Sequence, residues 1–120
     1  MISKEHRFEG SRSLRFVYQK GATSRGPLFS VKAALNPRRQ SYRSAVVVSR
    51  KVHKSAVARN RMRRRLYEII RNLETDIDQP YDIVLTVFNE SLLEESPQSL
   101  ARQVKKQLMV AGVLARRPSK

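Results

Sequence analysis

The feature that most constrains the fold is a helical apolar stripe that begins inside a dense run of positive charge. Eight of the sixteen residues at positions 50–65 are Lys or Arg, and none is acidic. Ser55 suits a helix N-cap, so we expect a helix from Ser55 to about Leu73. Its buried face recurs at i, i+3, i+4 spacing, as Met62, Leu66, Ile69, Ile70 and Leu73. A cationic helix anchored in a core favours a shaped surface for a polyanion over a loose basic tail.

Strand and helix patterns alternate along the rest of the chain. Residues 28–35 alternate, with Phe29, Val31, Ala33 and Leu35 on one side. The β-branched run in residues 43–49 is apolar on both faces, which predicts a strand inside a sheet covered on both sides. Residues 81–88 predict another buried strand. Helices are expected at residues 11–20, ending at Gly21, and from Ser96-Pro97 to Gly112.

These patterns place two or three strands before the basic helix and one after it. They predict an α+β fold in the order α-β-β-β-α-β-α, a two-layer sandwich with a mixed four-stranded sheet. The strands on either side of the basic helix should be parallel, because the long connection permits it. Residues 1–114 are expected to form one domain, and residues 115–120 a frayed basic tail.

The charge distribution points to a polyanionic partner. The net charge is +15, and residues 1–67 alone carry 18 basic and two acidic side chains. Nucleic acid is the leading partner and an anionic membrane surface the second, because a polyanion relieves self-repulsion. The chain has no cysteine and only two distant histidines, so neither a disulfide nor a zinc site is expected. It has no apolar run of roughly 20 residues and no signal-peptide core, so we expect a cytoplasmic protein.

A helical wheel divides the cations of the predicted helix between two flanks. Arg61 and Arg65 fall on one flank, and Arg59 projects near the core, where we expect it to reach toward neighbouring strands. The Asn60 amide can orient a phosphate, a ribose hydroxyl or a metal-bound water, which makes it a candidate for an indirect metal contact. The opposite flank carries Asn60, Arg64, Tyr67 and Arg71.

Guanidinium groups bind phosphate bidentately and stay charged, and the amides of a helix N-terminus add an anion site. Lys51 and Lys54 lie beside that terminus. The candidate RNA-binding residues are Arg50, Lys51, Lys54, Arg59, Asn60, Arg61, Arg63, Arg64, Tyr67 and Arg71.

No catalytic constellation is apparent. Asp76, Asp78 and Asp82 read as solvated loop acids, and His53 is expected to pack or to contact phosphate. The chain has no glycine-rich phosphate loop, paired-carboxylate set or nucleophile elbow, so no active site is expected on the protein itself.

The basic run resembles the signature of the bacterial ribonuclease P protein subunit. That family shows Lys-x-x-Lys-x-Ala-Val-x-Arg-Asn-Arg where a strand leads into a helix, and residues 51–61 match it without a gap. The resemblance extends over about residues 7–114. It includes Arg7, Gly21, the strand at 28–35, Tyr81-Asp82-Ile83-Val84 and the last helix through Gly112.

The resemblance implies an RNA-binding subunit of ribonuclease P, the endoribonuclease that removes the 5′ leader from precursor tRNA. It implies a left-handed crossover at the basic helix, catalysis in the RNA subunit, Mg²⁺ held through that RNA and phosphates, and no organic cofactor. Arg59, Asn60, Arg61, Arg63 and Arg64 would face RNA, and Leu14, Tyr18 and Lys32 would line a leader cleft between the first helix and the sheet.

Two positions depart from the family, which often has an aromatic ring at Leu14 and Arg at Tyr67. The expected partners are the catalytic RNA and precursor tRNA, with no membrane and no obligate protein partner. The alternative is a ribosomal or general RNA-binding protein of similar βαβ fold. An independent nuclease and a membrane-surface protein rank lower.

Overall fold

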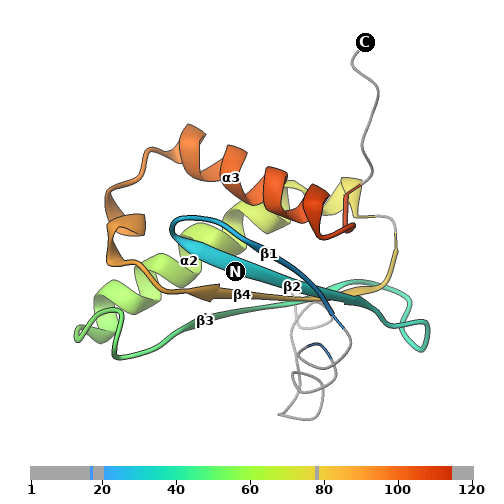
Figure 1. The fold of residues 1–120 in the computed structure, drawn as a ribbon, viewed down its shortest axis with the longest axis horizontal. Helices are drawn as coiled ribbons and strands as arrows, with labels where there is room; N and C mark the ends of the chain where they lie inside the picture. The colour runs from blue at the N-terminus through green and yellow to red at the C-terminus, as the bar shows by residue number, and fades with distance from the viewer. Residues whose placement is uncertain (1–16, 18–20, 78, 115–120) are drawn as a thin grey trace.

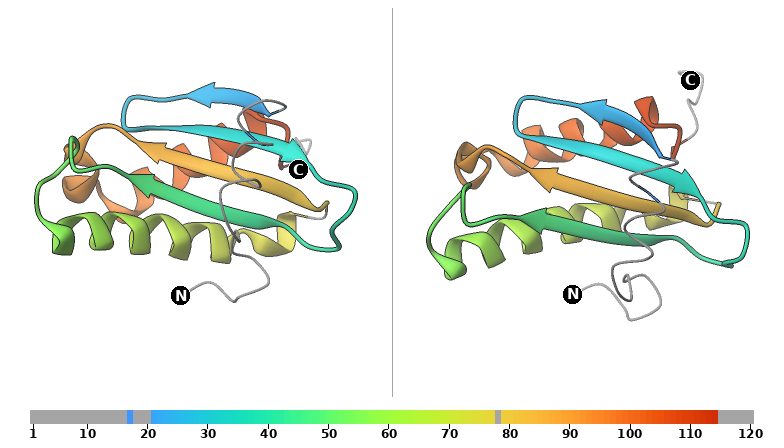
Figure 2. Two further views of the ribbon diagram at one scale, coloured as in Figure 1. Left: turned by 90° about the horizontal axis from the view of Figure 1, so that it is seen from below. Right: turned by 60° about the horizontal axis from the view of Figure 1, so that its bottom comes forward.

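The computed structural model describes residues 17, 21–77 and 79–114. Within these ranges two long helices cover one face of a single sheet of order β1-β2-β4-β3 (Figures 1 and 2). β3 and β4 are parallel and the other pairs are antiparallel, so the predicted mixed four-stranded α+β fold is confirmed. The elements are β1 (Ala22–Arg25), β2 (Phe29–Leu35), β3 (Arg43–Val48), α2 (Ala56–Asn72), η2 (Glu74–Asp76), β4 (Tyr81–Val87), η3 (Glu90–Glu94) and α3 (Pro97–Val110).

The helix predicted at residues 11–20 lies outside the described residues except for Val17, so Leu14 and Tyr18 are not placed. Val17 is helical and fully buried, and its carbonyl accepts the Gly21 N–H at 2.8 Å. A Cβ on Gly21 would lie 2.5 Å from that oxygen, so this close approach requires glycine. The tail at 115–120 also lies outside the described residues.

The core fills the space between the sheet and the two helices. Alternate residues of β2 and β4 point into it, because successive strand residues face opposite sides. Leu35, expected on the same side, is 46% exposed at the end of β2. The main buried residues are Phe29, Val31, Ala33, Val46, Val48, Met62, Leu66, Ile70, Ile83, Leu85, Val87, Leu100, Val104 and Leu108.

Local signals set the ends of both helices as the sequence predicts. The Ser55 hydroxyl accepts the Ala58 N–H at 3.2 Å, and the Ser96 hydroxyl accepts the Ser99 N–H at 3.2 Å. α3 ends at Val110 with Ala111 as its C-cap, and Gly112, which follows the cap, has φ 87°. The N–H of Val113 then reaches the Leu108 carbonyl at 2.9 Å, closing the helix in a Schellman motif.

The prediction that residues 43–49 form an interior strand is wrong, because β3 lies at the edge of the sheet. Val46 and Val48 are buried against the helical layer, whereas Ala45 and Val47 on the other face are half-buried. A β-branched run signals burial of side chains but not which strands flank it. β1 was not located from sequence, because this four-residue strand buries only Ser24.

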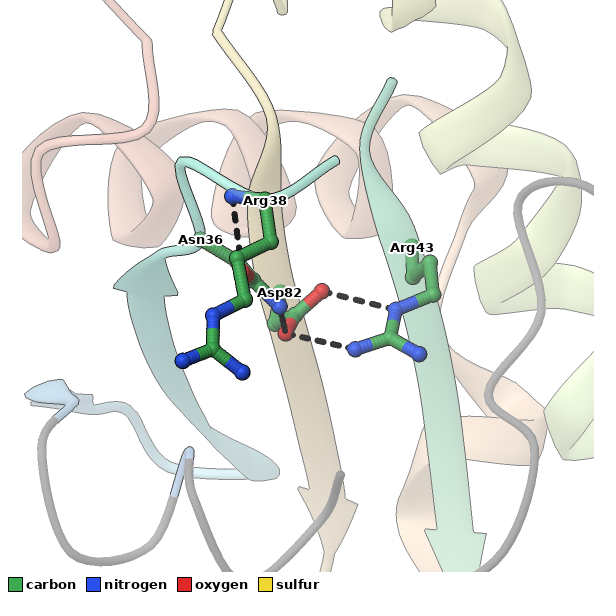
Figure 3. A network of polar contacts seen from close by, with 4 residues as sticks. All are labelled: Asn36, Arg38, Arg43 and Asp82. Carbon is green, nitrogen blue, oxygen red and sulfur yellow. Dashed lines mark hydrogen bonds and ion pairs between the residues drawn. The ribbon is translucent and has the colours of Figure 1, made fainter. Parts of the chain in front are cut away.

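The prediction that Asp82 is a solvated loop acid is also wrong, because Asp82 is fully buried. It lies on β4, on the sheet face turned away from α3 (Figure 3). Arg43 of β3 donates from Nε to Oδ1 at 2.9 Å and from Nη2 to Oδ2 at 2.8 Å. The Asn36 amide, which follows β2, donates to Oδ2 at 2.9 Å. One carboxylate therefore joins three neighbouring strands.

Candidate RNA-binding surface

The packing of α2 fixes which of its side chains reach solvent. Met62, Leu66 and Ile70 face the core, Tyr67 lies against β3, and Arg65 reaches η3 on the opposite flank. The outward face between these flanks carries six exposed polar or charged side chains: Asn60, Arg61, Arg64, Glu68, Arg71 and Asn72. Val57, 70% exposed, lies on the same face in the first turn.

Three of these cations have no partner within the described part of the chain. Arg61, Arg64 and Arg71 make no hydrogen bond or ion pair with any described residue. Their only acidic neighbour on the helix is Glu68. Unpaired guanidinium groups along one face of a helix are available to bind phosphate, because no described partner neutralises their charge.

Arg59 differs from its prediction. It does not reach toward neighbouring strands, because one guanidinium nitrogen donates to the carbonyls of His53 and Lys54, both at 2.9 Å. Arg59 thereby ties the loop before α2 to the first turn of the helix. His53 supports the same loop, because its Nδ1 accepts the Ser55 N–H at 3.0 Å.

The remaining cations of the loop precede the N-terminus of α2 in the chain. Arg50, Lys51 and Lys54 are all exposed, and the first turn of α2 carries no acid. The Asn60 side-chain oxygen accepts a hydrogen bond from half-buried Arg63. The Asn60 amide nitrogen remains as a donor for a phosphate oxygen, and its oxygen keeps a second lone pair that can accept a hydrogen bond.

Arg65 was not among the candidate RNA contacts and has a structural role. It donates to the carbonyls of Leu92 at 2.6 Å and Leu93 at 3.1 Å, and also to the Glu95 carbonyl. These acceptors belong to η3 and the residue after it, so Arg65 holds the β4–α3 connection against α2. No local pattern signals this role, because the partners are backbone oxygens distant in sequence.

Tyr67 combines two structural contacts. Its ring packs against the core and its hydroxyl oxygen accepts the Val46 N–H at 3.0 Å. This N–H lies on the outer edge of β3, where an unpaired backbone donor would invite another strand. Tyr67 therefore shields the sheet edge, and its contact with RNA stays a prediction.

Replacing Tyr67 with phenylalanine should lower the free energy of unfolding by about 1 kcal/mol, because the Val46 N–H loses its partner. Urea unfolding followed by circular dichroism measures the change. Tyr81→Phe is the matched control, since its ring also packs against the core. An equal effect in both variants would contradict the edge-shielding role.

The sheet face opposite the helices carries Lys32, the described residue that was predicted to line a leader cleft. Lys32 is half-buried on β2, next in register to Thr23 of β1 and Val84 of β4. Ser30 and Thr86, paired with each other, lie one step along the same face. Near the C-terminal end of β2 the same face is inaccessible to solvent, because Ala34, Asp82 and Val84 are buried there. Its accessible half is therefore polar.

A cavity of about 340 Å³ lies beside the loop that precedes α2 and is lined by His53, Asn89, Glu90, Ser91, Leu93 and Glu94.

The described residues contain no group of three or more His, Cys, Asp or Glu side chains arranged to hold a metal ion. No helix in the described ranges is long and apolar enough to cross a membrane.

Comparisons with known proteins agree with this geometry. The family model described as Ribonuclease P matches residues 2–112. The ribonuclease P protein component of Pseudanabaena sp. is 36% identical over 87 residues, covering 72% of this chain and 75% of that protein. The component from Clostridium botulinum is 37% identical over 89 residues, covering 73% and 78%.

Solved structures show the same fold. The Staphylococcus aureus RNase P protein superposes with a TM-score of 0.80 at 21% identity, covering 91% of this chain and 97% of that one. The Thermotoga maritima RNase P protein gives a TM-score of 0.67 at 26% identity, covering 94% and 98%. A ribonuclease P protein component takes part in a tRNA-processing enzyme, which implies an RNA subunit as its partner. On the family match over most of its length, the chain belongs to the ribonuclease P protein family.

Proposed function

We propose that this chain binds the 5′ leader of precursor tRNA and stabilises the catalytic RNA of ribonuclease P, while the RNA carries out the hydrolysis. The observation that carries the proposal is the outward face of α2, where Arg61, Arg64 and Arg71 are exposed and unpaired within the described residues. Folded RNA concentrates phosphate charge, and guanidinium groups on a folded helix neutralise it at a lower entropic cost than a loose tail that must first be ordered.

The sheet offers a second contact surface that suits a single strand. The half of its second face that carries Thr23, Ser30, Lys32 and Thr86 presents hydrogen-bonding side chains rather than apolar ones. Unpaired nucleotides are held through backbone contacts to such groups and by stacking of their bases. The leader would lie here, and Leu14 and Tyr18 remain candidates for its other wall.

Mg²⁺ enters the proposal only through the RNA. The proposal places the metal on the RNA, because the described residues contain no group of three or more His, Cys, Asp or Glu side chains arranged to hold a metal ion. The protein would instead add positive charge near the RNA, which lowers the concentration of metal ion needed to screen phosphate repulsion.

Cleavage of precursor tRNA by the cognate catalytic RNA tests this function. At low Mg²⁺ the protein is expected to stimulate cleavage, and it should bind precursor tRNA with a leader more tightly than mature tRNA. Equal affinity for both RNAs without stimulation would identify a general RNA-binding protein. Cleavage by the protein without catalytic RNA would place the chemistry on the protein and contradict the proposal.

A further inference from the structure

An exposed aromatic ring lies at one corner of the sheet, outside the core. Phe88 follows β4, is 38% exposed and is absent from the hydrophobic core. The guanidinium carbon of Arg25, at the end of β1, lies 4.5 Å from the centroid of its ring. A cation at this distance is attracted by the electrons of the ring face, so the two side chains hold each other in place.

Strand register places this pair on the accessible sheet face. Ser24 is buried and the next residue, Arg25, is exposed, so Arg25 points to the side away from the core. Arg25 is in register with Ser30, which is in register with Thr86. The Phe88 N–H donates to the Leu28 carbonyl at 3.1 Å, so the ladder between β2 and β4 continues to the ring.

The same corner adjoins the basic run. Val48 is in register with Val87 in the parallel β3–β4 pair. The chain therefore leaves β3 toward Arg50 and Lys51 beside the point where it leaves β4 at Phe88. Arg25 therefore lies on the ring from the β1 side, and the segment that leads to Arg50 and Lys51 leaves the sheet from the neighbouring strand on the β3 side.

The Arg25–Phe88 pair differs in its chemistry from an isolated apolar side chain on the surface. A planar guanidinium held on an aromatic ring presents a flat, positively charged surface, and unpaired RNA bases stack on both aromatic rings and guanidinium planes. The neighbouring cations suit the phosphates on either side of such a base. A folded duplex would not fit this chemistry, because its bases are already stacked.

We propose that Arg25 and Phe88 form a stacking site for one unpaired base of the bound RNA. The site lies at the end of the sheet from which the chain leaves β3 toward the N-terminus of α2. The proposal rests on the proposed function, in that the single strand lying on the sheet face supplies the base. The phosphate next to that base would be held by Arg50 and Lys51. Stacking recognises the flat face common to all four bases, so the site would select for a single strand rather than for a sequence.

The absence of tryptophan from the chain provides a direct test. Phe88→Trp introduces the only indole, and its fluorescence should be quenched when precursor tRNA with a leader is added to the protein with its catalytic RNA. Leu35→Trp is the matched control, because Leu35 is an exposed apolar residue at the opposite end of β2. Quenching of both variants alike, or of neither, would overturn the stacking site.

Abasic substitution of the leader locates the base and separates this proposal from the broader one. One abasic position should weaken binding to the unmodified protein by roughly 5- to 100-fold, within the range for base–aromatic stacking. Phe88→Ala should lose affinity by a similar factor and become insensitive to that position. Leader-dependent binding in which Phe88→Ala keeps full affinity would overturn the stacking site alone. Loss of leader dependence in the unmodified protein would overturn both proposals.

Discussion

Replacing Asp82 with alanine is expected to lower the free energy of unfolding by about 3–5 kcal/mol, because it removes the carboxylate that pairs with the buried guanidinium of Arg43. Arg43 is 7% exposed and gives two hydrogen bonds to the carboxylate, so its charge cannot reach water without opening the edge of the sheet. Asn36 loses its acceptor as well. The melting temperature should fall by roughly 10–25 °C.

A double replacement separates loss of the ion pair from loss of packing. Arg43→Met combined with Asp82→Leu removes both charges and fills much of the same space, so it should recover most of the stability lost by Asp82→Ala. Urea unfolding followed by circular dichroism compares the variants. A loss below about 1 kcal/mol for Asp82→Ala would be typical of an exposed pair and would contradict the burial of this one.

α2 and α3 were predictable because their signals are local. The stripe from Met62 to Leu73 and the cap at Ser55 both lie within α2 itself or beside it, and the structure places the helix within a residue of the expected limits. Gly112 likewise ends α3 through its own backbone conformation. Such patterns do not depend on where other strands lie.

The position of a strand within the sheet could not be predicted from local sequence patterns. β3 carries an interior-like sequence yet lies at the edge, because α2 covers one face and the Tyr67 hydroxyl shields its outer side. The prediction that Asp82 is solvated failed for a related reason. Its burial depends on the register that brings Arg43 beside it, and register is set by the whole sheet.

The density of charge predicted an exposed cationic surface on α2, but not which of its cations make contacts within the protein. Arg61, Arg64 and Arg71 are exposed as expected, whereas Arg59 and Arg65 donate to backbone carbonyls. The pairing of Arg25 with Phe88 gave no sequence signal, because it joins the ends of β1 and β4. A cation run therefore indicates a surface, and only the packed structure indicates which cations remain available.

Replacing Arg61, Arg64 and Arg71 together with glutamine should produce the largest change in RNA binding. Each lost phosphate contact removes about 0.7–0.9 from the slope of log affinity against log salt concentration, so the magnitude of the slope should fall by about 2–3. Between about 50 and 200 mM salt, the unmodified protein should lose roughly 20- to 40-fold more affinity for the catalytic RNA than the variant. Stability should change little, because all three side chains are exposed.

A control of equal charge distinguishes specific contacts from overall electrostatics. The triple replacement of Arg102, Lys105 and Lys106 with glutamine on α3 removes the same three charges from other exposed positions. It should leave the slope nearly unchanged, because contacts with phosphate, rather than net charge, release counterions. Equal reductions for the two triple variants would mean that α2 attracts RNA only as part of a diffuse positive field, and the outward face of α2 would then no longer carry the proposed function.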